Sequence, residues 1–330
     1  TCRQLLSNPK IPFVFRSATQ ALLGLSYTER MNYTLAESII REARKGSSIF
    51  QNLDLFLTAE ISWADYLLST GNANEAYISI SKAIMRAERY VVPRGILLDA
   101  YYCEARIAAF KHSLRDLKIL LKKFRIRLQP QDAVHRMQLL HITAMLHKAE
   151  GNITLALQTL DEAFDYASIN SFHLLKVRTL IDKVACLYVK GDSEQAKHWL
   201  YKAVQGASTY GYQNSLIGMD KSVGNALVNY SSSTQASPAI RNFVKRALSK
   251  SISNKANTQI ATSTPSSSLS SLSAREKEVV SLLKLGMSRQ EISDALCVSI
   301  NTTKKHLSSV YAKLGVETKT ELLNLLPPSF

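Results

Sequence analysis

Hydrophobic and polar positions in the first two thirds of the chain alternate with the period of an α-helix. On both sides of Gly71, apolar residues recur every three or four positions, from Ile61 to Leu68 and from Ala76 to Ala87. This is the spacing of one buried face on each of two helices. The glycine can adopt the left-handed conformation that ends the first helix, and Asn72 suits the short turn before the second. The pattern therefore predicts a helical hairpin.

The same turn recurs with a period of 40 residues. Glycine, then Asn or Asp, then alanine occupy matching offsets in the runs 71–76, 151–156 and 191–196. Further members of the series are expected at 31–36 and, in degenerate form, at 111–116. We expect the alanine to lie where the two helices of a hairpin cross most closely. Because one hairpin cannot bury its apolar face alone, the repeats predict a stacked solenoid with an extended groove.

The period fades after residue 205, and the composition changes after residue 248. Four glycines interrupt the pattern between 205 and 246, where we expect a terminal capping repeat: Gly206, Gly211, Gly218 and Gly224. Residues 249–268 are mostly Ser, Thr, Asn and Ala, with too few apolar side chains to offset the entropy lost on ordering. We therefore expect a repeat domain at 1–248, a flexible Ser/Thr-rich linker at 249–268 and a separate domain at 269–330.

The C-terminal domain has the start and stop signals of four short helices. Three capping boxes pair a hydroxyl with a glutamate three residues later: Ser273 with Glu276, Ser288 with Glu291, and Thr318 with Glu321. The stop signals are Gly286, Gly315 and the pair Pro327 and Pro328. Residues 297–299 form a three-residue turn of the length found in a helix-turn-helix, and Ser299 is placed to cap the third helix.

The third of these helices has one apolar and one polar face. The face expected to pack on the domain carries Thr303, Leu307, Val310 and Leu314. The opposite face carries Asn301, Lys304, Lys305, Ser308 and Ala312. Small polar side chains and amines so placed can reach base edges in a major groove. By composition alone the two lysines are solvated side chains on an exposed helix, but the surrounding helices favour contact with DNA.

Four runs in this domain, 272–279, 286–292, 299–306 and 313–316, are similar to the LuxR/FixJ-type helix-turn-helix nearly from end to end. The resemblance covers about a fifth of the chain. It implies a bacterial transcription regulator whose third helix enters the major groove and whose fourth helix mediates dimer contacts. The chain departs from the family at Thr303, where Val is usual, at Ser293, where Ala is usual, and at Lys319, where Arg is common.

The resemblance also implies roles for individual side chains. Residues expected to face the bases are Lys304, Lys305 and Ser308, which the helix pattern selects together with Asn301. Residues expected near the phosphates are Ser299, Thr302, His306, Lys313 and Lys319. Residues expected at the dimer contact are Glu321, Leu322 and Leu325. His306 fits a structural role on the helix surface equally well, and Lys319 would lack the bidentate phosphate contact of an arginine.

The repeat region resembles tetratricopeptide-like arrays, although its period exceeds the 34 residues of the standard repeat. It is most similar to the long-period repeats of the maltose-activator type of regulator, which bind inducer and lie next to a LuxR-type domain. The resemblance implies that the repeats bind a small-molecule inducer or a protein partner. Because the chain starts at Thr1 rather than Met, we expect sequence upstream, where that family has an ATPase domain.

The net charge of +15 makes contact with a polyanion plausible. Only a small part of this excess belongs to residues 269–330, which carry eight Lys or Arg and six Asp or Glu. A cluster of basic residues lies at 111–127, and we interpret it as a solvated helix face in preference to a nucleic-acid or partner surface.

Chemistry other than DNA binding finds little support in the sequence. The chain has no nucleotide-binding glycine loop, no HExxH and no GxSxG, so we do not expect an enzyme or a cofactor. The four cysteines and seven histidines are too scattered for a metal site, and the cysteines are expected to be buried thiols. No run of about 18 apolar residues predicts a membrane span, and we expect a cytoplasmic, nucleoid-associated protein.

Together these patterns predict an all-α protein: a TPR-like helical-repeat solenoid, a flexible linker and a four-helix LuxR-type helix-turn-helix domain. The predicted function is sequence-specific binding of double-stranded DNA as a dimer, with repeats that sense an inducer or partner and control self-association. The alternative is a repeat scaffold for protein–protein interaction in which the helix-turn-helix is only a DNA anchor. Target genes, and activation versus repression, stay open.

Overall fold

The computed structural model describes residues 6, 12–49, 52–129, 131–217, 220–232, 237–261, 272–284, 287–296, 298–314, 316, 318 and 321–322. Within these ranges all regular secondary structure is helical, as predicted. The chain divides into two compact units, Thr1–Lys255 and Ala256–Phe330. No helix in the described ranges is both long and apolar enough to cross a membrane.

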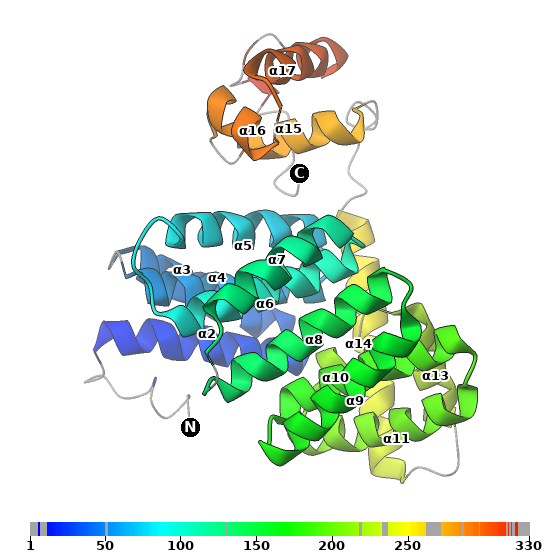
Figure 1. The fold of residues 1–330 in the computed structure, drawn as a ribbon. Helices are drawn as coiled ribbons and strands as arrows, with labels where there is room; N and C mark the ends of the chain where they lie inside the picture. The colour runs from blue at the N-terminus through cyan, green and yellow to red at the C-terminus, as the bar shows by residue number, and fades with distance from the viewer. Residues whose placement is uncertain are drawn as a thin grey trace. The chain divides into compact units, whose positions relative to one another are not determined.

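Antiparallel helical hairpins make up the first unit (Figure 1). The first helices of the hairpins are α2 (Phe13–Glu29), α4 (Leu53–Ser69), α6 (Arg94–Phe110), α8 (Ala133–Ala149) and α10 (His173–Lys190). The second helices are α3 (Tyr33–Ile49), α5 (Ala73–Ala87), α7 (Leu114–Arg127), α9 (Ile153–Ile169) and α11 (Ser193–Tyr210). After them come α12 (Gln213–Ile217), α13 (Lys221–Ser232) and α14 (Pro238–Ala261).

A left-handed residue follows the first helix of every hairpin. These residues are Met31 (φ 53°), Gly71 (φ 89°), His112 (φ 55°), Gly151 (φ 81°) and Gly191 (φ 87°). The three glycines predicted from the period are confirmed, and so is the upstream member of the series. The degenerate member lies at His112, one position later than the strict period predicts, because that hairpin takes one extra residue before its turn.

The residue five positions after each turn lies in the core. Four of these positions are alanines with 0% exposure: Ala36, Ala76, Ala156 and Ala196. Their burial places these alanines inside the hairpins, between the paired helices. In the third hairpin, where the turn is shifted by one residue, the same place is taken by Leu117, which is also fully buried.

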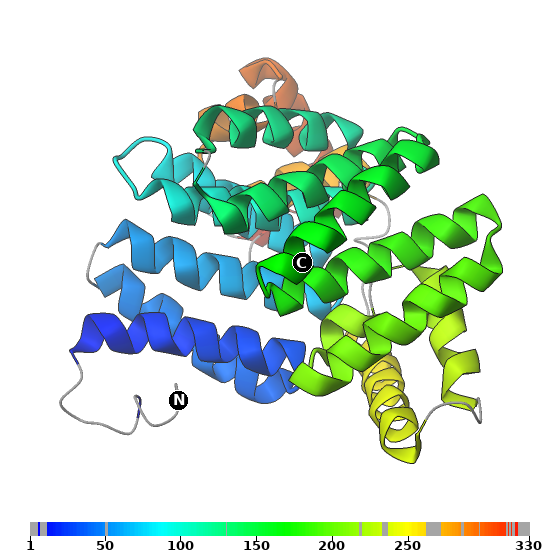
Figure 2. The same cartoon turned by 60° about the horizontal axis from the view of Figure 1, so that its bottom comes forward.

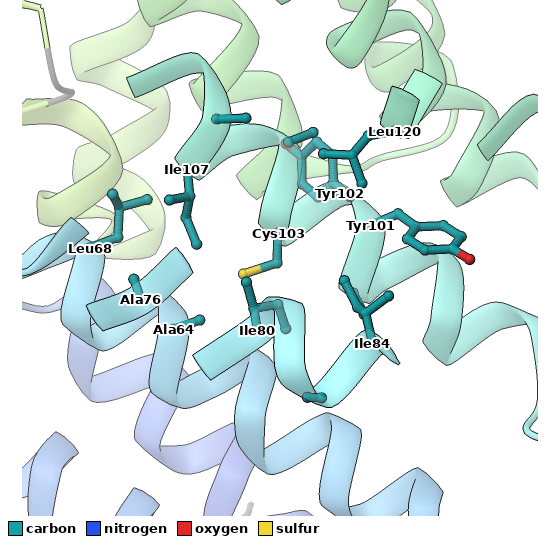
Figure 3. Packing of buried hydrophobic residues seen from close by; sticks show 14 of the residues in the cluster. Ala64, Leu68, Ala76, Ile80, Ile84, Tyr101, Tyr102, Cys103, Ile107 and Leu120 are labelled. Carbon is teal, nitrogen blue, oxygen red and sulfur yellow. The ribbon is translucent and has the colours of Figure 1, made fainter. Parts of the chain in front are cut away.

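Side chains from neighbouring hairpins form a shared core. Figure 3 shows Ala64 and Leu68 of α4 facing Ala76 and Ile80 of α5, with Ile107 of α6 beside them. All of these residues belong to one buried cluster that extends from α2 to α8. A second cluster continues through α9, α10 and α11 to α14. Because each hairpin covers the apolar face of the next, the array behaves as the predicted solenoid.

The end of the repeat unit differs from the sequence pattern in three places. Gly224 does not interrupt a helix but lies inside α13. Gly206 likewise lies inside α11, where a Cβ would come within 3.3 Å of Val177 Cγ2. The absence of a side chain thus allows α11 and α10 to approach closely. Helix α14 continues to Ala261, so residues 249–261 of the expected linker are helical. That segment lacks Pro and Gly, which would break a helix; residues 262–268 lie outside the described ranges.

The array returns on itself, so that its last helices meet its first. Helix α12 packs against α2, and Figure 2 shows the yellow-green end of this unit beside the end of the blue helix α2. The hydroxyl of Tyr33 donates to Asn214 Oδ1 at 3.2 Å, and Asn214 Nδ2 donates to Ser69 Oγ at 2.8 Å. These bonds join hairpins that are far apart in the sequence, which the local pattern did not predict.

The second unit contains the helices α15 (Ala274–Lys284), α16 (Arg289–Ala295) and α17 (Ile300–Leu314). Its core consists of Leu272, Val279, Val280, Leu283, Ile292, Leu307, Val310 and Leu322. The capping boxes at Ser273 and Ser288 are confirmed by reciprocal hydrogen bonds, and at the third start Glu321 N donates to Thr318 Oγ1 at 3.2 Å. Of the predicted fourth helix the structure describes residues 321–322, which are helical.

Candidate nucleic-acid interface

The start of α17 is held by its own sequence. Ser299 Oγ accepts a hydrogen bond from Thr302 N at 3.1 Å, which confirms the predicted cap. The same hydroxyl lies 2.8 Å from Thr302 Oγ1. In the preceding turn, Val298 N donates to Ser293 O at 3.0 Å and so ties α17 to the end of α16. The two helices and this turn form the expected helix-turn-helix.

One face of α17 packs on the domain as the sequence predicted. Thr303 and Val310 have 0% exposure and Leu307 has 2%. These side chains recur at the spacing of one helical face and fit against α15 and α16. Leu314, predicted for the same face, has a side chain outside the described set. The opposite face of α17 is therefore directed away from the domain core.

The four residues predicted to face bases all lie exposed on that opposite face. They are Asn301, Lys304, Lys305 and Ser308. Their spacing covers two turns of the helix, and no bulky side chain separates them. The surface offers two ammonium groups, an amide that can donate and accept, and a short hydroxyl. Such groups match the donors and acceptors on base-pair edges.

A buried carboxylate on α15 anchors α17 in this orientation. Glu276 accepts hydrogen bonds from Ser309 Oγ at 2.6 Å and from Lys313 Nζ at 2.7 Å, both on α17. It also accepts from Ser273 N at 2.7 Å. The Lys313 ammonium, the Ser309 hydroxyl and the Ser273 amide together lower the pKa of Glu276 to about 2. This carboxylate is therefore ionised at neutral pH and joins the two helices.

From the sequence, Glu276 was predicted only as part of a capping box, and its contacts with α17 were not predicted. The spacing of Glu276 from Ser309 and Lys313 exceeds thirty residues, so no local pattern indicates that they meet. A second contact of this kind joins Arg275 to the end of α16, where its guanidinium donates to Leu296 O at 2.7 Å. The first contact holds α17 on α15, and the second holds the end of α16 on the same helix.

The residues predicted near phosphates differ in their surroundings. Thr302 and His306 are half-buried beside the base-facing surface, and Ser299 is exposed although its hydroxyl serves the cap. Lys313 is 37% exposed and its ammonium is paired with Glu276, so a phosphate would share that amine with the carboxylate. Lys319 lies outside the described residues. Their phosphate roles stay predictions.

The residues predicted at a dimer contact are also placed differently from one another. Glu321 is exposed, whereas Leu322 has 0% exposure and belongs to the core of its own domain. Leu325 lies outside the described residues. In this structure Leu322 is covered by its own helices, so it supports the fourth helix from inside. The dimer contact stays a prediction.

One known protein family matches this part of the chain. Residues 270–326 match the family of bacterial regulatory proteins, LuxR family. These residues form a LuxR-family helix-turn-helix domain. The match includes α15, α16, α17 and the start of the fourth helix, so it coincides with the geometry described above. A domain of this family binds DNA.

Curated relatives share this domain. A protein of Escherichia coli K12 named as the HTH-type transcriptional regulator YhjB is 43% identical over 58 residues, which are 18% of this chain and 29% of that protein. The CsgBAC operon transcriptional regulatory protein of the same organism is 38% identical over 53 residues, 16% of this chain and 24% of its own. Fimbriae Z protein, also from that organism, is 40% identical over 62 residues, which are 19% of this chain and 30% of that protein. The chain thus spans less than a third of each of these relatives.

Proposed function

We propose that this protein is a sequence-specific DNA-binding transcription regulator of the bacterial type. The observation that carries the proposal is the exposed face of α17, where Asn301, Lys304, Lys305 and Ser308 lie together on a helix-turn-helix of a DNA-binding family. Helix α17 enters the major groove and brings these side chains to the base edges. Lysine pairs with guanine acceptors and asparagine with adenine, while the short Ser308 reaches a base through water.

Contacts to the phosphates set the register of α17 in the groove. Thr302 and His306 flank the base-facing surface, and Lys313 and Lys319 add positive charge toward the C-terminal end of the helix. The fourth helix pairs two copies through Glu321 and Leu325, with Leu322 supporting it from the core. Two domains then occupy half-sites about one helical turn apart on DNA.

Selection of binding sites from random duplexes with the full chain tests the DNA-binding role. A regulator that reads sequence enriches one motif, and a dimer enriches two half-sites with fixed spacing. Lys305→Ala is then compared with the parent on the enriched site and on random DNA. Loss of a base contact costs about 1–3 kcal/mol on the cognate site and much less on random DNA.

Lys277→Ala supplies the matched control, because Lys277 is exposed and belongs to α15, not to α17. It removes the same charge without touching a base-facing residue. Equal losses on cognate and random DNA for Lys305→Ala would reject base reading. Failure of the folded chain to enrich any motif would reject the proposed function.

The repeats supply the regulatory part of the proposal. They receive an inducer or protein partner, alter self-association and so raise the local concentration of paired DNA-binding domains. The surface of the array suits this role, because stacked hairpins form an extended groove. Like other DNA-binding regulators, the protein acts in the cytoplasm at the nucleoid and carries out no catalysis.

The competing possibility is a repeat scaffold that uses the helix-turn-helix only as a DNA anchor. The two roles differ in what DNA binding responds to. A regulator changes its affinity for the enriched site, or its oligomeric state on it, when its effector is added. A scaffold keeps both unchanged while it recruits a protein partner, and mass photometry of the DNA complex measures this difference.

A further inference from the structure

A cavity of about 640 Å³ opens between α9, α10, α11 and α14. This volume lies within the range of small-molecule sites. Its apolar wall includes Phe164, Val177, Leu180 and Ile240, of which Val177 and Leu180 are almost fully buried. Gly206 also lines it. A glycine inside a helix lowers stability, so it usually has a structural reason, such as a close approach of two helices or a space that a side chain would fill.

The charged side chains of this cavity are basic. Lys176 and Lys202 line it together with His173, and no Asp or Glu is among its lining residues. In the described part of the chain neither lysine has a carboxylate within ion-pair distance. Lys176 Nζ instead lies 4.9 Å from the centre of the Phe164 ring, and Lys202 Nζ lies 4.2 Å from that of Trp199. Both ammonium groups are thus placed without an anionic partner.

A neighbouring cavity of about 440 Å³ differs in the charge of its lining residues. There Lys183 is paired with Asp161, and Lys190 and Asp192 also line the wall, so its charges cancel. Trp199 lies between the two cavities, with Lys183 on one ring face and Lys202 near the ring as well. The excess of positive charge is therefore a property of the larger cavity and not of this part of the array in general.

Hydrogen bonds within the larger cavity already engage several of its other polar side chains. Ser208 Oγ and Thr209 Oγ1 both donate to Gln205 O, at 2.9 and 3.0 Å. Tyr210 Oη and His173 Nε2 lie 3.1 Å apart, and their rings are stacked with centres 4.1 Å apart. A ligand that enters this cavity therefore meets two ammonium groups, a flat aromatic edge and an apolar wall.

We propose that this cavity binds a small organic anion, whose carboxylate or phosphate pairs with Lys176 and Lys202 and whose apolar part lies on Phe164 and Val177. An anion gains two charge-assisted contacts there and displaces no existing ion pair. Ile240 of α14 is in the wall, and α14 precedes the DNA-binding domain in the chain. The ligand thus contacts the helix that leads into that domain, and through this helix ligand binding changes DNA binding. This regulatory consequence rests on the proposed function, whereas the binding of the anion itself does not.

Binding to the full chain is measured with phenyl phosphate and benzoate as probes, and with inorganic phosphate and benzyl alcohol as comparisons. Calorimetry gives the Kd, and the fluorescence of Trp199 beside Lys202 reports occupancy of the site. At least one aromatic anion is expected to bind saturably and more tightly than inorganic phosphate or the neutral alcohol. The tighter of the two anions identifies the headgroup as a phosphate or a carboxylate.

Variants locate the site. Lys176→Gln and Lys202→Gln should each weaken anion binding roughly tenfold, a change of one decade in Kd. Lys202→Arg keeps the charge and should retain binding, which guards against loss through misfolding. Lys197→Gln, on the same helix but exposed and paired with Glu194, should leave the Kd unchanged.

Absence of saturable binding by both aromatic anions overturns the proposal. So does equal binding of benzyl alcohol, or an unchanged Kd in both glutamine variants. Because none of these measurements uses DNA, they separate this proposal from the proposed function. Site selection can succeed with an empty cavity, and the cavity can bind an anion in a chain that selects no DNA motif.

Discussion

The guanidinium of Arg178 on α10 donates to Glu29 Oε1 on α2 at 2.9 Å, although 149 residues separate them in the chain. Both side chains are almost completely buried. Glu29 also accepts from Ser215 N at 3.2 Å and Ser215 Oγ at 2.9 Å, and the same guanidinium lies 3.7 Å from Asp65 Oδ2. This network joins the first, second and last hairpins, so it closes the array.

Replacing Arg178 with Met should strongly destabilise the repeat unit. The substitution leaves Glu29 buried without its counter-charge, and breaking a buried pair in this way costs about 3–5 kcal/mol. Urea unfolding followed by tryptophan fluorescence measures the loss. The signal is specific, since the two tryptophans of the chain, Trp63 and Trp199, both belong to the repeat unit.

Lys197→Met is the control for this prediction. Lys197 pairs with Glu194 three residues away at 2.7 Å, and both side chains are exposed to solvent. An exposed pair contributes at most about 1 kcal/mol. If the two variants lost the same stability, the network around Glu29 would contribute no more than an exposed ion pair and would not be what closes the array.

Glu104 on α6 should make the repeat unit less stable as the pH rises from about 4.5 to 7. Burial raises the pKa of this carboxyl from 4.5 to about 7, although it accepts a hydrogen bond from Ser81 Oγ. Because the folded chain holds the proton more tightly than the unfolded chain, the penalty is absent at low pH and complete once the buried group ionises. A shift of this size corresponds to about 3 kcal/mol.

Glu104→Gln keeps the acceptor for Ser81 and cannot ionise. The variant should match the parent at pH 4 and exceed its stability at pH 8, as urea midpoints at both pH values will measure. Glu75→Gln, at an exposed position of α5, should not reproduce this divergence. Parallel pH curves for Glu104→Gln and the parent would contradict the raised pKa.

The hairpins could be predicted from sequence because their signals are local. Gly71, Gly151 and Gly191 adopt the left-handed conformation that their position after an apolar run requires. The turn at His112 lies one residue later than the period predicts, because that hairpin takes one extra residue before its turn and no glycine marks the position. Contacts such as Arg178 with Glu29 could not be predicted, because polar residues on separate hairpins have no periodic pattern that shows which of them meet.

The exposed surface of α17 could be predicted for a similar reason. Alternation along a single helix separates buried Thr303 and Leu307 from exposed Lys304 and Lys305 without any knowledge of the rest of the chain. The contact of Glu276 with Lys313 sets the direction of that helix. Because this contact joins two helices, it could be found only in the structure. Local amphipathicity thus predicts which surface is available, while tertiary contacts decide how it is presented.

Thr303→Val should stabilise the DNA-binding unit. The threonine is completely buried, and its Oγ1 has no hydrogen-bond partner among the residues that the structure describes. A buried hydroxyl without a partner costs about 1–3 kcal/mol, and valine has nearly the same shape. We expect a gain of about 1 kcal/mol, measured by slower hydrogen exchange in peptides covering α17 of the full chain.

The adjacent Thr302→Val gives the opposite expectation. Thr302 Oγ1 lies 2.8 Å from Ser299 Oγ at the start of α17, so its removal breaks an existing hydrogen bond. Exchange in α17 should become faster in this variant. Faster exchange in Thr303→Val as well would mean that its hydroxyl has a partner, such as a bound water, and that valine is not tolerated there.

Glu276→Gln should loosen α17 at neutral pH and weaken DNA binding without removing any DNA contact. The folded domain holds the pKa of Glu276 near 2, below its ordinary 4.5, mainly through Lys313. The stabilisation is therefore present above about pH 4.5 and is lost as the pH falls toward 2. Denaturant titration followed by the amide NMR signals of α17 should show a lower midpoint for the variant at pH 7 and a smaller difference at pH 3. Glu278→Gln, which breaks only the exposed contact with Arg275, is the matched control, and an equal effect from it would exclude Glu276 as the anchor of α17.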